Sequence, residues 1–202
     1  MDVDTLVLRA PGGGDPVLRA PRDIDPAMLA PSLEATPVTR HATRGVAVSY
    51  SESFAFRTSG VAPAFFDVTT LVRGVVQRSG VQHGQVLATV AHTTCALIVQ
   101  ENEPLLLADL ADRLRRFAAR DEAYRHNEMD VRTVNVCGLD ECANGHSHCQ
   151  HALLGASTAL LVDGHDLVLG RWQRLLLVEL DHPRPREMMV QVTGVVPTDT
   201  PS

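Results

Sequence analysis

The densest group of side chains that could do chemistry lies in one short stretch of the chain. Within residues 144–155 there are three imidazoles and one thiol: His146, His148, Cys149 and His151. Imidazole is the commonest metal ligand and titrates near neutral pH. On a helix, His148 and His151 share a face. Asn144 or Ser147 could cap that helix, whose free N–H groups attract anions. The stretch therefore indicates a metal or anion site or, as the plainer alternative, exposed histidines at a polar helix start.

A second candidate group follows a predicted apolar strand at residues 85–92. His92, Thr93 and Thr94 come at the strand's end, where binding sites are common and hydroxyl groups can bind anions. Glu101 follows, and its carboxylate suits a hard cation or proton transfer. The alternatives are a hydrogen-bonded core histidine at position 92 and a solvated helix cap at position 101.

The other polar groups have plainer interpretations. Residues 120–146 form a long irregular segment that contains Tyr124-Arg125-His126-Asn127 and Asp140-Glu141, which by themselves suggest surface polarity. Trp172 is typical of a core or interface, and Gln173 beside it could face a pocket. The spacing of the cysteines at 95, 137, 142 and 149 does not match a structural zinc site. A mixed site of a cysteine with His146 stays open.

Composition excludes several classes of protein. The net charge of −6 argues against a nucleic-acid binder. All 18 basic residues are arginine, so no lysine can form a Schiff base or serve a phosphate-binding loop. No segment approaches the roughly 18 apolar residues of a membrane span. The acidic N-terminus lacks the pattern of a signal peptide, so we expect a cytoplasmic protein with reduced cysteines.

The pattern along the chain predicts one α+β domain with tails. Residues 1–44 carry a proline every five positions from Pro11 to Pro31 and are interpreted as a disordered extension; residues 45–196 form the domain, and 197–202 a C-terminal tail. Periodicity predicts helices that start at Asp67, at Pro104 and at Ser147. Expected strands, mostly antiparallel, are residues 46–57, 85–92, 96–100, 157–162, 166–172, 173–181 and 187–196, with a hairpin turn at 163–166.

The order of the motifs closely resembles the YjbQ family, whose members are labelled secondary thiamine-phosphate synthase enzymes. The motifs are His-Thr-Thr-x-Ala-Leu from His92, Glu-Asn at 101, Tyr-x-His at 124, Asn-x-x-x-His-x-x-x-x-Leu-Leu-Gly from Asn144, and Leu-Gly-x-Trp-Gln at 169. The likeness runs from about Phe54 to Gly194. It implies a compact β-sandwich that assembles as a trimer. The matching motif positions are His92, Thr93, Glu101, Asn102, His126, Asn144, His148, Gly155, Trp172, Gln173 and Glu179.

The resemblance also implies a site and a reaction. The reaction joins a pyrimidine pyrophosphate to a thiazole phosphate and releases pyrophosphate, with a divalent metal, zinc or magnesium, and no organic cofactor. The expected metal ligands are His92, His126 and His148; the expected catalytic groups are Glu101, Asp140 and His148. Residues expected to bind the substrate or its phosphates are Thr93, Thr94, Asn102, Asn144, Ser147 and Gln173. Two alternatives are a metal-assisted hydrolase or transferase of another small phosphorylated metabolite, and a trimeric binding protein without turnover.

Three positions depart from the family pattern. His146 stands where the family often has an acid, Cys95 where it has a small residue, and Arg171 where it usually has threonine. Imidazole suits zinc better than magnesium, so the first change favours zinc.

Overall fold

The computed structural model describes residues 43–136 and 142–198, which form an α+β fold of antiparallel sheets with inserted helices. The strands are β1 (Gly45–Arg57), β2 (Ala64–Asp67), β3 (His83–Val90), β4 (Cys95–Glu101), β5 (Ser157–Asp163), β6 (Asp166–Leu167), β7 (Gln173–Glu179) and β8 (Pro185–Pro197). The helices are α2 (Thr69–Ser79), α3 (Pro104–Phe117), the 3-10 turn η1 (Arg125–Asn127) and α4 (Gly145–Leu154). Most of the predicted N-terminal tail and the last residues of the C-terminal tail lie outside the described residues. Within the described part, no helix is both long enough and apolar enough to cross a membrane.

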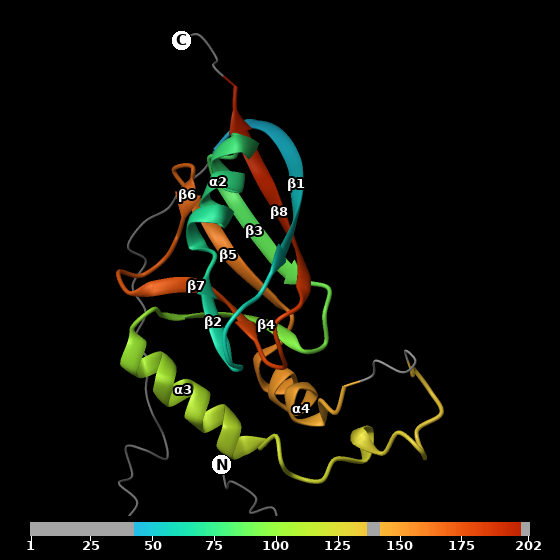
Figure 1. Cartoon of the computed structure of the whole chain (residues 1–202). Helices are drawn as coiled ribbons and strands as arrows, with labels where there is room; N and C mark the ends of the chain where they lie inside the picture. The colour runs from blue at the N-terminus through green and yellow to red at the C-terminus, as the bar shows by residue number, and fades with distance from the viewer. Residues whose placement is uncertain (1–42, 137–141, 199–202) are drawn as a thin grey trace, which may run out of the picture. The chain divides into compact units, whose positions relative to one another are not determined.

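The strands form two sheets (Figure 1). One has the order β1-β8-β3-β5-β6 and the other the order β2-β7-β4, and every neighbouring pair is antiparallel. β1 and β8 pair along their whole length, from Gly45 opposite Pro197 to Arg57 opposite Pro185. Both strands alternate between covered and exposed residues, which is the pattern of a sheet with one face against a core.

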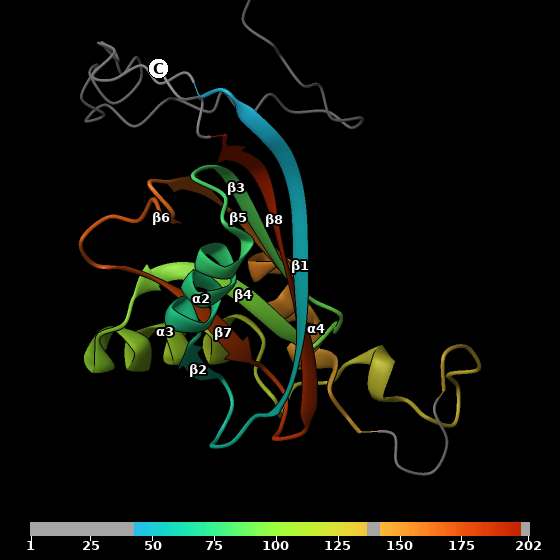
Figure 2. The ribbon, with the colours of Figure 1, turned by 90° about the horizontal axis from the view of Figure 1, so that it is seen from above.

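The alternation of β4 shows how the layers are stacked. Cys95 and Leu97 point into a core that both sheets share with α2, whereas Ala96 and Ile98 point to the other face. On that other face they pack with Leu114 of α3. Side chains of a strand alternate between faces, so the three-stranded sheet is covered on both sides. Figure 1 shows α2 and α3 on opposite sides of the smaller sheet, and Figure 2 shows α2 beside the larger sheet.

The helix ends follow from local chemistry, with one exception. α2 starts at Thr69, two residues after the expected Asp67, and its N-cap residue Val68 makes no side-chain cap bond, although the backbone N–H of Thr69 donates to Oδ1 of Asp67 over 2.9 Å. α2 ends at Gly80 in a left-handed conformation with φ of 69°. For α4 the expected cap by Asn144 or Ser147 does not form. Instead Oδ1 of Asn127 accepts the N–H of Gly145 over 2.9 Å, so the cap comes from η1.

Two strands of the structure differ from the expectation. β2 was not predicted, because four residues are too few to show a period. The strand expected at 166–172 consists only of Asp166 and Leu167. After them a turn forms in which the N–H of Gly170 donates to Oε1 of Gln173 over 2.7 Å, and the chain crosses from the large sheet to the small one. The predicted hairpin turn is present, with positive φ at Gly164 (58°) and His165 (65°).

Candidate functional site

Four segments that are distant in sequence enclose a cavity of about 540 Å³. They are the β3–β4 turn, the loop that follows η1, the start of α4, and the connection from β7 into β8. The described lining residues are Ala91, His92, Thr93, Thr94, His126, Arg132, Val134, Asn135, Asn144, His148, Arg184 and Arg186. Three are arginine, three are histidine, and none of the described lining residues is acidic.

Strand pairing brings two of these segments together. Val90 at the end of β3 is opposite Met188 near the start of β8, and Cys95 at the start of β4 is opposite Glu179 at the end of β7. Both connections therefore leave the sandwich at the same end. The chain then brings α4 against that end, where Oγ of Ser147 donates to the carbonyl of Leu180 over 2.8 Å.

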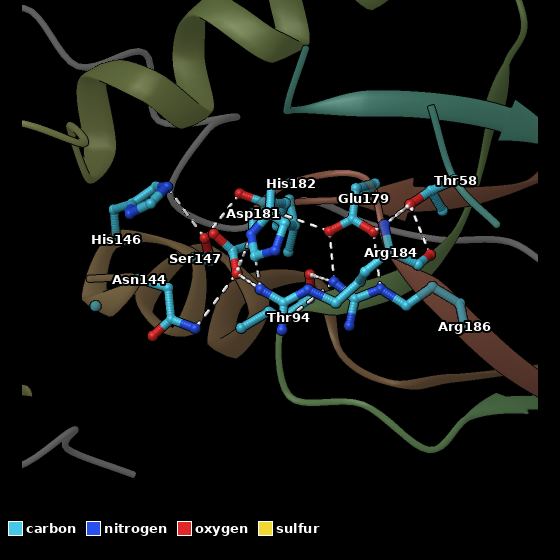
Figure 3. A network of polar contacts seen from close by, with 12 residues as sticks. Thr58, Thr94, Asn144, His146, Ser147, Glu179, Asp181, His182, Arg184 and Arg186 are labelled. Carbon is cyan, nitrogen blue, oxygen red and sulfur yellow. Dashed lines mark hydrogen bonds and ion pairs between the residues drawn. The ribbon is translucent and has the colours of Figure 1, made fainter. Parts of the chain in front are cut away.

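A buried ion pair holds Arg186 in the wall (Figure 3). Nε of Arg186 donates to Oε2 of Glu179 over 2.7 Å, and Nη2 donates to Oε1 of Glu179 and to both oxygens of Thr94. Thr58 also donates to Glu179, over 2.8 Å. Burial raises the pKa of Glu179, but these hydrogen bonds outweigh it and the pKa lies below its ordinary value. The bonds to described residues use Nε and Nη2 of Arg186, which leaves Nη1 for the cavity.

A second carboxylate network positions Arg184. Oδ2 of Asp181 accepts from Nη2 of Arg184 and, over 3.3 Å, from Nδ2 of Asn144. Arg184 also contacts Nδ1 of His182 at 2.8 Å. Figure 3 shows these groups in one row with the Glu179 pair. Oδ1 of Asn144 is buried and has no partner among the described residues. The network orients a guanidinium and an amide at the cavity.

His92 presents a donor rather than a lone pair. The backbone N–H of Glu187 donates to Nε2 of His92 over 2.8 Å. Burial, followed by the charge of Arg186, lowers the pKa of His92, so the ring is neutral at neutral pH. A neutral imidazole that accepts at Nε2 carries its proton on Nδ1. His92 therefore has an N–H group, and no second lone pair, to offer.

The rings of His126 and His148 are in contact in the cavity. Their ring centroids are 4.5 Å apart with the rings inclined at 66°. Nη1 of Arg132 lies 3.4 Å from Nε2 of His126, and Nη2 donates to the carbonyl of Asn135 over 2.5 Å. Burial first, and the neighbouring His126 second, lower the pKa of His148.

The described donors fit an anion better than a metal ion. No group of three or more His, Cys, Asp or Glu side chains is placed to hold a metal among the residues with described positions. Nε2 of His92 accepts the N–H of Glu187, so this ring offers no lone pair to a metal ion. The three arginines of the lining, the Nδ1–H of His92 and the Thr93 and Thr94 hydroxyls are donors of the kind that bind phosphate. The three-histidine metal site stays a prediction, now centred on His126 and His148.

The structure separates the residues expected at the site into two groups. His92, Thr93, Thr94, His126, Asn144 and His148 line the cavity. Glu101 and Gln173 lie opposite each other at the end of β4 that is far from the cavity. The length of β4, at roughly 3.3 Å per residue, puts them about 20 Å from Cys95 at its cavity end. Asn102, next to Glu101, donates to Asp67. Ser147 is fully buried against Leu180. Asp140 lies outside the described residues.

Sequence reasoning missed the three arginines of the cavity. A pattern that points to two of them is Arg184-Pro185-Arg186 at the start of β8, since residues two apart in extended chain point to the same side. A chain without lysine must supply its phosphate-binding cations from arginine. No sequence pattern points to Arg132, because it lies in an irregular loop.

Comparison with known proteins agrees with this architecture. A family model described as "UPF0047 protein YjbQ-like" matches residues 52–195. The chain is 33% identical over 145 residues to a UPF0047 protein of Methanothermobacter thermautotrophicus, a match that covers 72% of this chain and 92% of that one. It is 31% identical over 130 residues to the UPF0047 protein YugU of Bacillus subtilis, covering 63% and 88%.

Solved structures give the same result. A YbjQ-like protein of unknown function from Sulfolobus solfataricus P2 aligns with a TM-score of 0.65 and 29% identity, over 74% of this chain and 99% of that chain. A hypothetical protein from Aeropyrum pernix K1 aligns with a TM-score of 0.60 and 30% identity, over 71% and 98%.

Proposed function

Since this chain belongs to the UPF0047 family of YjbQ-like proteins, we propose that its arginine- and histidine-lined cavity binds a small phosphorylated metabolite and supports departure of pyrophosphate. The observation that carries the proposal is the meeting of Arg132, Arg184 and Arg186 in one cavity with no described acid in its lining. A guanidinium group matches two phosphate oxygens at once.

The specific reaction we propose is a low-level synthesis of thiamine phosphate. The bond between the pyrimidine and its pyrophosphate breaks, pyrophosphate leaves with the electron pair, and the thiazole phosphate takes its place. Charge grows on the leaving oxygens, where preorganised donors are most effective. Nη1 of Arg186 and the Nδ1–H of His92 are donors held by the protein before substrate arrives, so their orientation costs nothing during the reaction.

A divalent metal remains part of the proposal only as an aid to binding. His126 and His148 are close enough to share an ion, and such an ion would neutralise phosphate oxygens. The residues of the protein that act without it are the three arginines, His92 and the two threonines.

The test supplies the pyrimidine pyrophosphate and the thiazole phosphate together and measures both pyrophosphate and thiamine phosphate. We expect slow, equal release of the two products and a loss of at least tenfold in Arg132→Gln. Binding of the pyrimidine pyrophosphate without products would favour the alternative of a trimeric binding protein. Hydrolysis of other small phosphate esters at a higher rate would favour the hydrolase or transferase alternative.

A further inference from the structure

A second cavity, of about 320 Å³, lies on the other side of α4. Asn144 and His148, four residues apart, face the first cavity, whereas His146 and Gln150, also four apart, line the second. Leu180 and Asp181, the end of α3 with residues 118–121 after it, and residues 61–63 complete its wall. His146, Gln150 and Asp181 are 5%, 1% and 1% exposed. Each has one buried polar atom without a hydrogen-bond partner among the described residues: His146 Nδ1, Gln150 Oε1 and Asp181 Oδ1.

The hydrogen bonds of Gln150 decide which way its amide points. Nε2 donates to the carbonyl of Leu114 over 3.1 Å and to that of Ala118 over 3.0 Å. Only the nitrogen of an amide can donate, so a flipped amide would set its oxygen against two carbonyls. Oε1 is therefore the atom without a partner, and it is an acceptor.

The same reasoning fixes the tautomer of His146. Oγ of Ser147 has one hydrogen, which it donates to the carbonyl of Leu180 over 2.8 Å. Its contact with Nε2 of His146 at 3.1 Å must then be a bond that the imidazole donates. The proton sits on Nε2, and Nδ1 is a bare lone pair. Figure 3 shows His146 and Ser147 beside Asp181.

All three atoms without partners are therefore acceptors. Oδ2 of Asp181 takes the bonds from Arg184 and Asn144, which leaves Oδ1 as the third. A buried acceptor without a donor destabilises the folded protein, so three such acceptors at one cavity favour a ligand with N–H or O–H groups. An ammonium group carries three N–H donors and a positive charge for Asp181.

We propose that this second cavity binds the protonated amine of a small zwitterion. The exposed part of its lining includes Arg115, Arg120 and Asp121. Arg115 is held by Asp112 at 3.0 Å and by the carbonyl of Ala62 at 3.3 Å. A simple cation would meet these arginines as like charges, whereas a carboxylate or phosphate on the same molecule would pair with them. The site is separate from the phosphate cavity and does not depend on its function.

The experiment uses three matched probes: β-alanine, propylammonium, which lacks the carboxylate, and propionate, which lacks the ammonium. Protein amide shifts in NMR titrations of the full chain give dissociation constants. We expect β-alanine to bind with the highest affinity, propylammonium to bind more weakly, and propionate to show no saturable binding. His146→Leu, which removes the lone pair of Nδ1, should weaken the binding of β-alanine at least tenfold.

Arg120→Gln tests the outer half of the site without touching a buried group. It should weaken the binding of β-alanine several-fold and leave the binding of propylammonium unchanged. Arg116→Gln, at an exposed position of α3 outside the cavity lining, should change neither. If His146→Leu does not fold, the comparison of β-alanine binding between Arg120→Gln and Arg116→Gln tests the proposal. Absence of amine binding, equal binding of propionate, or β-alanine binding that none of these variants changes would each overturn the proposal. Sulfate binding in the first cavity is measured separately, so the failure of one site is not the failure of the other.

Discussion

The backbone N–H of Glu187 in β8 donates over 2.8 Å to Nε2 of His92, which lies in the turn between β3 and β4. This bond makes Nδ1–H the only group that the neutral ring can turn toward a ligand. We expect His92→Ala to weaken sulfate and pyrophosphate binding roughly tenfold or more, because a hydrogen bond to a charged group is worth about 1.5–3 kcal/mol. Isothermal titration measures both anions, with His151→Ala, outside the cavity lining, as the control. Loss of zinc affinity with unchanged anion affinity would contradict this role.

Acidification should separate an anion site from a metal site by the sign of its effect. Burial lowers the pKa of His148 and of His92 below the ordinary 6.5, so both are neutral at neutral pH and gain a proton only in acid. Protonation adds positive charge beside Arg132 and Arg184, so sulfate should bind more tightly as the pH falls toward about 5. Metal binding requires neutral imidazoles and should weaken over the same range. Parallel sulfate and zinc titrations at a series of pH values give the two signs. Sulfate affinity that stays flat or falls would contradict the expectation.

Arg132 can be compared with a matched neighbour. Arg132 lines the cavity, whereas Arg125 is exposed at the start of η1 and does not. We expect Arg132→Gln to lower pyrophosphate affinity roughly tenfold and to reduce the salt dependence of binding, because a phosphate contact is lost. Arg125→Gln has the same change in net charge and should have little effect. Equal losses in both variants would mean that only the general charge of the protein matters.

Glu179 should contribute to stability mainly above its ordinary pKa of 4.5. Its folded pKa lies below the ordinary 4.5, so the stabilisation is present above that value and is lost as the pH falls through the folded pKa. Glu179→Gln leaves Arg186 charged and buried without its partner, at a cost of about 3–5 kcal/mol. Urea unfolding at neutral and acidic pH should show this loss at neutral pH and a smaller difference in acid. Glu187→Gln, at an exposed position, serves as the control, and an equal loss there would refute the assignment.

We also expect the protein to assemble as a trimer. Leu87, Leu161 and Met189 are 42%, 64% and 51% exposed and lie on the outer face of the five-stranded sheet, where strand register places them on one side. An open sheet face with large apolar side chains is typical of an interface. Light scattering should give three times the 21.9 kDa mass of one chain. Leu161→Arg should shift the population toward monomers, and Leu105→Arg, on α3 and 77% exposed, should not. A monomer at micromolar concentration would contradict the expectation.

Local sequence determined most of the elements of this protein. Alternation in residues 46–57 and 187–196, the start of a helix after Asp67, and the turn at Gly164 depend on neighbours in the chain, and each is present in the structure. The order of the motifs was also enough to identify the family, because that order can be read from the sequence without any knowledge of three-dimensional contacts.

Only the tertiary structure decided which polar groups meet. His92 and His126 come from different segments and share a cavity. Glu101 follows His92 by only nine residues but lies at the opposite end of β4, because an extended strand separates the residues at its two ends. The free nitrogen of His92 likewise depends on Glu187 of β8, which is 95 positions along the chain. Hydrogen-bond partners at that separation are set by strand register and helix packing, and no local pattern encodes them.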